Sequence, residues 1–378
     1  MMARASLVPV LVCWPVVAAG QVSDLNGDGC VDLQDFRRLQ VDYTGPHCRA
    51  PMGLMEMRTV PSDGEGPRYT FLVAKNEVTT EQFVEFLNDA QQDGGVTHRG
   101  SYMYFQPSGD VTTTGLNPMF SRVPSGHITY SPNAPLGTRY GLDSRFANHP
   151  IVHVSWLGAL KFCNWLTIQE GLGPNELCYS EGPYSEYWHA TSITTANWTA
   201  RDLTANERLD LVQGYRGFRL PMDEGGSGYG TPDGMPSPFN EWYKCAAYDA
   251  AAPAFSRIGL NHENIPARHW LFGFGRDTLS VGDGNFSGAS TPAGFYDGLN
   301  WLLGGTRTNE NNNPFGIYDL SGNVAEWMQD RAASQHNRVI RGGSFRDPPA
   351  NLMVSVRGYG PFGEATSDAI GFRVVRVP

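Results

Sequence analysis

The chain has 378 residues, enough for two or three average domains or for one large domain with an appendage. Charged residues make up only 17%, whereas glycine (44), proline (26) and aromatic residues (12%) are abundant, which predicts a loop-rich globular protein and excludes a helical bundle or a disordered chain. The formal net charge of −10 argues against a nucleic-acid partner, because phosphate binding requires clustered Lys and Arg, and it favours divalent cations.

Residues 1–20 have the pattern of a secretory signal peptide. Arg4 supplies a positive start, residues 5–17 are almost wholly apolar, and residues 18–20 are small enough for a signal peptidase. A membrane anchor is disfavoured, because the apolar run is short and contains two prolines. We therefore expect a secreted, periplasmic or cell-surface protein with no membrane span.

Five cysteines follow the predicted signal peptide: Cys30, Cys48, Cys163, Cys178 and Cys245. An odd number implies at least one free thiol or an intermolecular bridge. Five are too few for a disulfide scaffold in an exported chain of this length, so we expect the core to hold most of the fold. The pairing stays open, and a Cys30–Cys48 bridge is one possibility.

The segment DLNGDGCVDLQD has the register of a calcium loop. Carboxylate, amide and carbonyl oxygens converge on one cation when they occupy alternate positions of a loop that winds around it. The predicted ligands are Asp24, Asn26, Asp28, the backbone carbonyl of Cys30, Asp32 and Asp35. The alternative is an acidic Asn/Gly turn without a metal.

This loop ends in Asp35, which is shorter than the Glu of sensor EF-hands. With Val-Asp before it, the loop resembles the repeat of type I dockerins, so we assign residues 21–48 to a dockerin-like calcium-binding module. The resemblance implies a cohesin-like partner. Dockerins carry two repeats and one is visible here, so calcium binding is the stronger expectation.

From about residue 49 to residue 378 the chain reads as one large domain. The first predicted helix, residues 81–90, begins after Thr79 or Thr80 as N-cap and has Phe83, Phe86 and Leu87 on its apolar face.

Residues 149–156 alternate like a strand and lead into a second amphipathic helix, LGALKFCNWL. We expect Leu160 and Cys163 on the buried face of this helix. His149 and His153 would lie about 13 Å apart on such a strand, too far for one metal ion. His262 and His269 flank a proline-containing loop and could converge.

Five sequence blocks follow one another over about three hundred residues: EVTTEQF, HPIVHVSW…CNWL, RLP…EW, GIYDLSGNVAEW and RGGSF…GFR. Together they resemble the sulfatase-modifying-factor family, whose founding activity is formylglycine generation. The resemblance implies an α/β (α+β), loop-rich fold of the C-type-lectin-like, formylglycine-generating-enzyme type. Three segments depart from it by insertion, at roughly 92–146, 180–213 and 225–240.

The same resemblance implies two calcium sites in the main domain. The first is expected at the side chains of Asp319 and Glu326 with the carbonyls of Gly322 and Val324. The alternative at Asp319 and Glu326 is helix capping and a buried hydrogen-bond network without a metal.

The second calcium site is expected at Asn285 with the carbonyl of Phe286, and at Asp297 with the carbonyl of Leu299. Carboxylates and carbonyls are the oxygen donors that calcium prefers.

Active members of the family bind copper through two cysteines after the GGS turn. Those places hold Asp347 and Leu352, and no cysteine follows Cys245. Copper(I) requires soft thiolate ligands, so copper is not expected and no catalytic residue is assigned. Asp347 and Asp368 could act as paired carboxylates, although loop-capping roles are favoured.

Cys163 and Cys245 correspond to cysteines that some members use in disulfides. Their partner places hold Val374 and a residue near Arg357, so we expect two buried thiols.

Two hypotheses of function follow. In the first, the protein is a secreted, calcium-stabilised, non-redox member of the family that binds a protein or glycan ligand or takes part in surface assembly. In the second, it is a formylglycine-generating-type or non-haem-metal oxidoreductase that acts on protein or small-molecule thiols. The missing cysteines favour the first, so whether the protein is an enzyme stays open.

Overall fold

The computed structural model describes residues 55–92, 96–99, 102–105, 118–121, 127–180, 202–224, 237–259, 264–331, 337–362 and 366–378. All of them belong to one compact unit, residues 51–378. The expected signal peptide, the calcium loop at 24–35 and a Cys30–Cys48 bridge lie outside the described residues.

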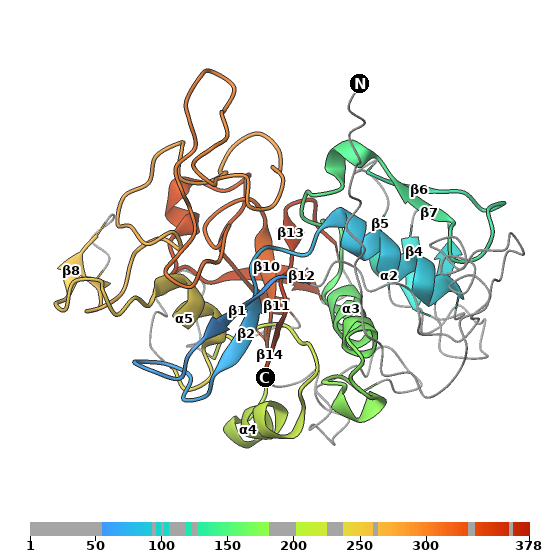
Figure 1. Cartoon of the computed structure of the whole chain (residues 1–378), viewed down its shortest axis with the longest axis horizontal. Helices are drawn as coiled ribbons and strands as arrows, with labels where there is room; N and C mark the ends of the chain where they lie inside the picture. The colour runs from blue at the N-terminus through green and yellow to red at the C-terminus, as the bar shows by residue number, and fades with distance from the viewer. Residues whose placement is uncertain are drawn as a thin grey trace, which may run out of the picture. The chain divides into compact units, whose positions relative to one another are not determined.

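Two small sheets lie in the middle of the domain and make it a mixed α/β protein (Figure 1). The first has the order β1-β2-β14, and the second has the order β12-β11-β10-β13, in which only β10 and β13 are parallel. Their strands are β1 (Met57–Val60), β2 (Phe71–Ala74), β14 (Val375–Arg376), β10 (Ala325–Arg331), β11 (Asn337–Arg341), β12 (Gly358–Phe362) and β13 (Ile370–Gly371).

Helix α2 (Thr80–Gln92) begins where the sequence predicts it. Thr79 is the N-cap: its amide donates to Gln82 Oε1 at 2.9 Å, and its hydroxyl accepts from the Gln82 amide at 3.3 Å. This reciprocal pair satisfies two backbone groups that a helix start leaves open. Phe83 and Phe86 are buried as expected and pack against Phe162 of the second helix, with ring centroids 5.9 and 5.7 Å apart.

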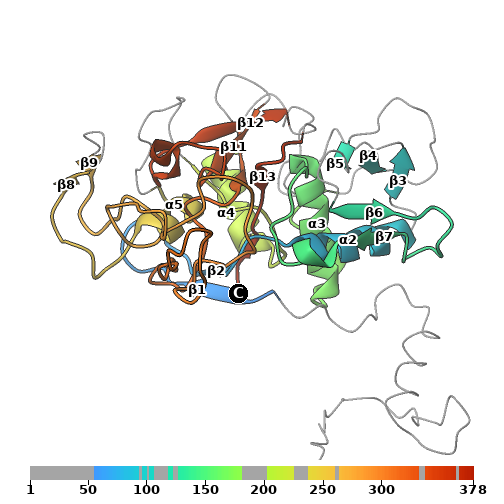
Figure 2. The same cartoon turned by 90° about the horizontal axis from the view of Figure 1, so that it is seen from above.

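That second helix, α3 (Trp156–Gln169), is capped by Ser155, whose hydroxyl accepts from the Gly158 amide at 3.0 Å. Leu160 and Cys163 are fully buried, as predicted. Helix α3 packs with α2 beside the central sheets (Figures 1 and 2).

The strand predicted before α3 is wrong. Residues 149–155 form only isolated bridges, Pro150 with Thr79 and Val154 with Phe120. His153 has a left-handed φ of 59°, and its amide donates to Ser367 O at 2.7 Å. A residue in this conformation interrupts the alternation that a strand requires, so strand geometry no longer determines the spacing of His149 and His153.

The insertion at 92–146 contains small antiparallel sheets, which lie to the right in Figure 2. They are built from β3 (Val96–Arg99), β4 (Tyr102–Phe105) and β5 (Pro118–Ser121), and from β6 (Ile128–Tyr130) and β7 (Tyr140–Leu142). The insertion at 180–213 overlaps helix α4 (Ala205–Gly214), and most of the insertion at 225–240 lies outside the described residues.

Helix α5 (Glu241–Ala247) is capped by Asn240 and carries the second half of the RLP…EW block. The remaining short elements are β8 (Arg257–Ile258), β9 (Asn264–Ile265), η1 (Ser144–Phe146), η2 (Pro174–Glu176) and η5 (Pro349–Leu352). Within the described ranges, none of the helices has the length and apolar character needed to cross a membrane.

Candidate functional site

The GGS turn reverses the chain directly after β11. Gly342 and Gly343 have φ angles of 90° and 66°, in the left-handed region that favours glycine. A Cβ on Gly343 would lie 2.8 Å from the carbonyl oxygen of Asn351, so the two loop segments approach too closely for any other residue. The turn thereby places residues 344–347 beside η5.

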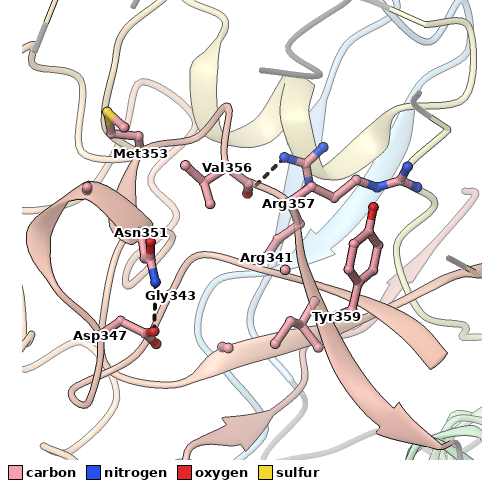
Figure 3. A pocket seen from close by; sticks show the side chains of 12 residues that line it. Arg341, Gly343, Asp347, Asn351, Met353, Val356, Arg357 and Tyr359 are labelled. Atoms are coloured by element: carbon pink, nitrogen blue, oxygen red, sulfur yellow. Dashed lines mark hydrogen bonds between the residues drawn. The ribbon is translucent and has the colours of Figure 1, made fainter. Parts of the chain in front are cut away.

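A cavity of about 230 Å³ lies behind this turn (Figure 3). Five polar or charged side chains line it: Arg341, Asp347, Asn351, Arg357 and Tyr359. The apolar part of its wall consists of Ala325, Ile340, Ala350, Met353 and Val356. Mixed walls with a few fixed polar groups are typical of ligand sites.

Asp347, at the first expected cysteine position, lines this cavity but is held by its own loop. Its Oδ2 accepts from the Ser344 amide at 2.9 Å and from the Ser344 hydroxyl at 2.6 Å, and its Oδ1 accepts from Asn351 Nδ2 at 3.0 Å (Figure 3). Asp368 is ion-paired with Arg346 instead. Asp347 therefore caps its loop, and the two carboxylates are directed to different partners.

Leu352, at the second expected cysteine position, is fully buried and does not line the cavity. It packs in an apolar cluster with Leu271 and Phe272. The only sulfur among the lining residues is the thioether of Met353. This donor set does not fit copper(I), which requires soft thiolates.

The charged side of the cavity depends on Asp223, which sequence reasoning missed. Arg341 donates to both Asp223 oxygens, at 2.7 and 2.9 Å, and Arg357 Nε donates to Oδ2 at 2.8 Å. Burial would raise the pKa of Asp223, but the two guanidinium groups hold it below its ordinary value. A sequence signal was available in two parts, since Asp223 follows the RLP block and Arg341 begins the RGGSF block.

Arg341 also orders the cavity wall. Its Nη1 donates to the carbonyl oxygens of Val354, Ser355 and Val356, at 3.2, 3.3 and 3.0 Å (Figure 3). A guanidinium held on both sides is rigid, because its donors have a fixed planar arrangement. The cavity is therefore preformed by packing and hydrogen bonds.

At the first predicted calcium site, the structure surrounds Glu326 with hydrogen-bond donors. Arg373 Nη2 lies 2.6 Å from Oε1 and Arg373 Nε lies 2.8 Å from each oxygen, while Trp242 Nε1 donates to Oε2 at 3.0 Å. Asp319 is directed elsewhere: its Oδ2 accepts from the Gly294 amide at 2.6 Å, and burial raises its pKa to about 6. In this arrangement protein donors engage both carboxylates.

A buried carboxylate that sequence reasoning also missed binds the backbone of residues 319–326, the segment predicted to hold the first calcium ion. Glu77 accepts from the Val324 amide at 3.2 Å and from Asn323 Nδ2 at 2.8 Å. Gly322 lies against Asn285, because a Cβ on Gly322 would be 2.5 Å from the Asn285 carbonyl oxygen. Residues of the two predicted calcium sites are therefore neighbours.

In the second predicted calcium site, Asn285 donates to the Ala289 carbonyl at 2.8 Å. Asp297 Oδ1 accepts from the Leu299 amide at 2.8 Å and from Asn300 Nδ2 at 3.0 Å, so it caps its own turn. Phe286 packs against an apolar cluster. Both calcium sites in the main domain stay predictions.

The histidines have separate environments. His149 Nδ1 lies 3.0 Å from the Ser290 hydroxyl, whereas the buried Nε2 of His153 has no hydrogen-bond partner. His269 is buried between Tyr243 and Tyr248, and His262 lies outside the described residues.

Over the part of the chain that the structure describes, no group of three or more His, Cys, Asp or Glu side chains is placed to hold a metal ion. Cys163 and Cys245 are buried free thiols, as predicted, and Cys178 is a third. Burial raises the pKa of Cys178 to about 12, which makes its thiol unreactive.

Comparison with known families gives one match that spans most of the chain. The sequence model of the family described as "Sulfatase-modifying factor enzyme 1-like domain" matches residues 47–378. A curated relative, "Chaperone protein LppX" from Paenibacillus barcinonensis, is 26% identical over 234 residues, which cover 60% of this chain and 69% of the relative.

Solved structures similar to this chain include the crystal structure of CarF, at 19% identity, with a TM-score of 0.40 and coverage of 82% of this chain and 87% of CarF. Treponema denticola variable protein 1 is 16% identical, with a TM-score of 0.36 and coverage of 85% and 95%. PvdO from Pseudomonas aeruginosa is 16% identical, with a TM-score of 0.35 and coverage of 85% and 91%.

Proposed function

Because the chain belongs to the sulfatase-modifying factor enzyme 1-like family, we propose that its main domain has the C-type-lectin-like fold of that family and binds a ligand, without redox chemistry, in the cavity behind the GGS turn. The observation that carries the proposal is the state of Asp347. This residue occupies the first expected cysteine position and lines the cavity, yet its carboxylate is used to cap the loop. In place of the soft metal ligand expected there, this chain has a carboxylate that supports the cavity wall.

A single amino-acid side chain of a protein partner is the occupant that the cavity fits best. Its volume of about 230 Å³ is below the range of about 300–1,000 Å³ typical of pockets for larger ligands. The wall of Ala350, Met353 and Val356 favours an apolar group, while Tyr359 and Asn351 belong to the polar part of the lining. The Paenibacillus relative is named a chaperone, which also favours a protein segment over a glycan.

The setting of this binding function is proposed from the sequence. The predicted signal peptide at residues 1–20 supports export, and the loop at residues 24–35 supports calcium binding next to the main domain. A cohesin-like partner for this loop remains the weaker expectation.

The binding half of the proposal is tested by saturation-transfer NMR on the full chain, with N-acetyl-leucine amide as the probe. We expect saturation transfer to the leucine side chain with the wild type and none with Ala350→Leu, which fills the cavity. Ala251→Leu is the matched control, because Ala251 is exposed and does not line the cavity. Equal transfer with both variants would show that the cavity is not the site.

The non-redox half is tested with a cysteine-containing sulfatase peptide, with and without added copper, and mass spectrometry of the product. We expect the peptide mass to be unchanged. The mass loss that accompanies conversion of the thiol to an aldehyde would overturn the proposal in favour of the oxidoreductase alternative.

A further inference from the structure

Residues 299–308 form a hairpin that rises from the domain as a tall orange loop in Figure 1. Trp301 bridges Arg307 across its two arms. Three backbone bonds close it: the Leu302 amide donates to Thr306 O at 2.8 Å, the Gly305 amide donates to Leu302 O at 3.1 Å, and the Thr308 amide donates to Asn300 O at 2.9 Å. The tip is therefore an ordered turn with its own hydrogen bonds.

This hairpin exposes large apolar side chains. Leu299, Trp301 and Leu303 are 68%, 65% and 107% exposed, with Leu299 in a bend and Leu303 in the turn at the end of the hairpin. Val281, 57% exposed, lies close to the hairpin, because its neighbour Gly282 accepts from the amide of residue 309 at 2.7 Å. These four residues are half of the eight large apolar side chains that the described residues expose, and clustering of this kind marks an interaction surface.

The charged residues of the hairpin lie at different distances from its tip. Residues 302–306, beyond the Trp301–Arg307 bridge, contain no charged side chain, and the exposed Arg307 lies level with Trp301 directly below this tip. At the base of the hairpin, the backbones of two acidic residues, Asp297 and Glu310, form an isolated antiparallel β-bridge. An uncharged tip, a cation below it and carboxylates farther away match the polarity gradient from acyl chains to headgroup phosphates and then to water.

We propose that the tip of this hairpin, with Leu303 at its end and Trp301 beside Arg307, inserts into the surface layer of a lipid bilayer. Trp is enriched at membrane interfaces, where its ring contacts both apolar and polar layers. Insertion of a backbone into an apolar layer is costly unless its amides are bonded internally, and the three backbone bonds of the hairpin lower that cost for the amides of residues 302, 305 and 308. Arg307 would lie at the depth of the phosphates, where a cation is stable.

A lipid surface is favoured over a protein groove by the same features. A protein groove is fixed in shape and gains specificity from charged contacts, whereas the tip offers leucines, glycines and Thr306 and no charged group. A bilayer accepts such a tip without complementary shape. Since the carboxylates at the base would be repelled by anionic lipid, we expect neutral phosphatidylcholine to be sufficient.

The test is co-flotation of the exported chain with phosphatidylcholine vesicles; the exported form avoids binding by the apolar residues 5–17. We expect the wild type to float and the double variant Trp301→Ser/Leu303→Ser to lose about tenfold or more in vesicle affinity, because two apolar side chains no longer enter the bilayer. Phe255→Ser/Ile258→Ser is the matched control, since Phe255 and Ile258 are 67% and 68% exposed outside the hairpin. Its affinity should equal that of the wild type.

Two further measurements separate insertion from other modes of binding. Brominated acyl chains should quench tryptophan fluorescence in the wild type and in the control, but not in Trp301→Phe, which keeps an apolar ring. High salt should not release the protein, because apolar insertion is not screened. The proposal is overturned if the wild type does not float, if the hairpin variant floats as well as the control variant, or if salt releases the protein. If the hairpin variant still binds vesicles but no longer binds a protein partner, the hairpin is a protein-docking element instead.

Discussion

Arg373 and Glu326 lie 47 residues apart in the chain and are joined by a fully buried ion pair, with Nη2 2.6 Å from Oε1. Arg373 comes from the GFR block and Glu326 from the GNVAEW block. A second pair has the same form: Arg219 of the RLP block donates to Glu241 of the following EW block at 2.5 and 2.6 Å. In this chain the RLP and EW segments, and the GNVAEW and GFR segments, are therefore joined by buried ion pairs.

Glu326→Gln should lower the free energy of unfolding by about 3–5 kcal/mol, because it leaves the guanidinium of Arg373 buried without a counter-charge. Urea denaturation measures the change. Glu56→Gln is the matched control: Glu56 pairs with Arg58 and Lys75, but its side chain is 54% exposed, so the loss should stay below about 1 kcal/mol.

The same experiment addresses calcium at this position. If the Glu326 carboxylate acts only through Arg373, the loss caused by Glu326→Gln should be equal with and without a chelator. If chelation of the wild type reproduces the loss and Glu326→Gln no longer responds to calcium, the predicted calcium site is present and the described pairing with Arg373 is replaced when calcium binds.

His153 should make the protein sensitive to acid. Burial lowers the pKa of His153; the charges of His127 and Arg346 act in the same direction and that of Asp368 opposes them. The unfolded chain gains a proton as the pH falls through about 6.5, whereas the native state gains it only at a lower pH, so stability declines below about 6.5.

Replacement of His153 separates its charge from its backbone conformation. His153→Asn should keep the fold, because Asn tolerates the left-handed φ of 59°, and should reduce the loss of stability between neutral and acidic pH. His153→Val should be less stable by about 1–3 kcal/mol at every pH, because a β-branched residue is strained there. Thermal melts over a pH series compare the variants, and an unchanged pH profile in His153→Asn would exclude this residue as the source.

The N-terminal loop should bind one calcium ion in the full chain. Asp24→Ala/Asp28→Ala removes two of the charged ligands that determine affinity, so titration calorimetry should show one site fewer than in the wild type. Asn26, Asp32 and Asp35 remain in this variant as weaker ligands. Glu56→Gln is the control, because Glu56 belongs to none of the predicted calcium sites, and the loop assignment is wrong if the stoichiometry is the same in all three proteins.

Local patterns predicted what local contacts determine. Thr79 and Gln82 are three residues apart, and their capping bonds follow from the sequence at that place. Loop capping by Asp347 was predicted for the same reason, since Ser344 and Asn351 are close to it in the chain.

Where the sequence failed to predict a backbone conformation or a side chain's partners, contacts between segments distant in the chain determine them. The apolar alternation around His153 is typical of a strand, but the bond of its amide to Ser367, far along the chain, sets a left-handed backbone instead. Glu326 has the residue type of a calcium ligand, and only the fold shows that Arg373 and Trp242 occupy its oxygens. Asp223 was missed because its two arginine partners lie 118 and 134 residues away.

Restoring the two cysteines should not restore a copper site. In Asp347→Cys/Leu352→Cys, the first thiol would face the cavity, but it would lose the hydrogen bonds that Ser344 and Asn351 donate to the carboxylate. The second would replace a fully buried side chain that packs against Phe272, so its sulfur would face the core and not the cavity. Leu352→Cys also removes apolar contacts, at a cost of about 2–5 kcal/mol by analogy with Leu→Ala.

We therefore expect the double variant to bind no stoichiometric copper(I) and to leave the cysteine of a sulfatase peptide unchanged. Metal analysis after dialysis and mass spectrometry of the peptide measure the two outcomes. Asp347→Cys alone is the control, because it keeps the apolar cluster around Leu352 and should be nearly as stable as the wild type apart from the lost loop cap. Tight copper binding by the double variant and not by this control would mean that residue 352 can turn toward the cavity, and that the site lacks only its two thiols.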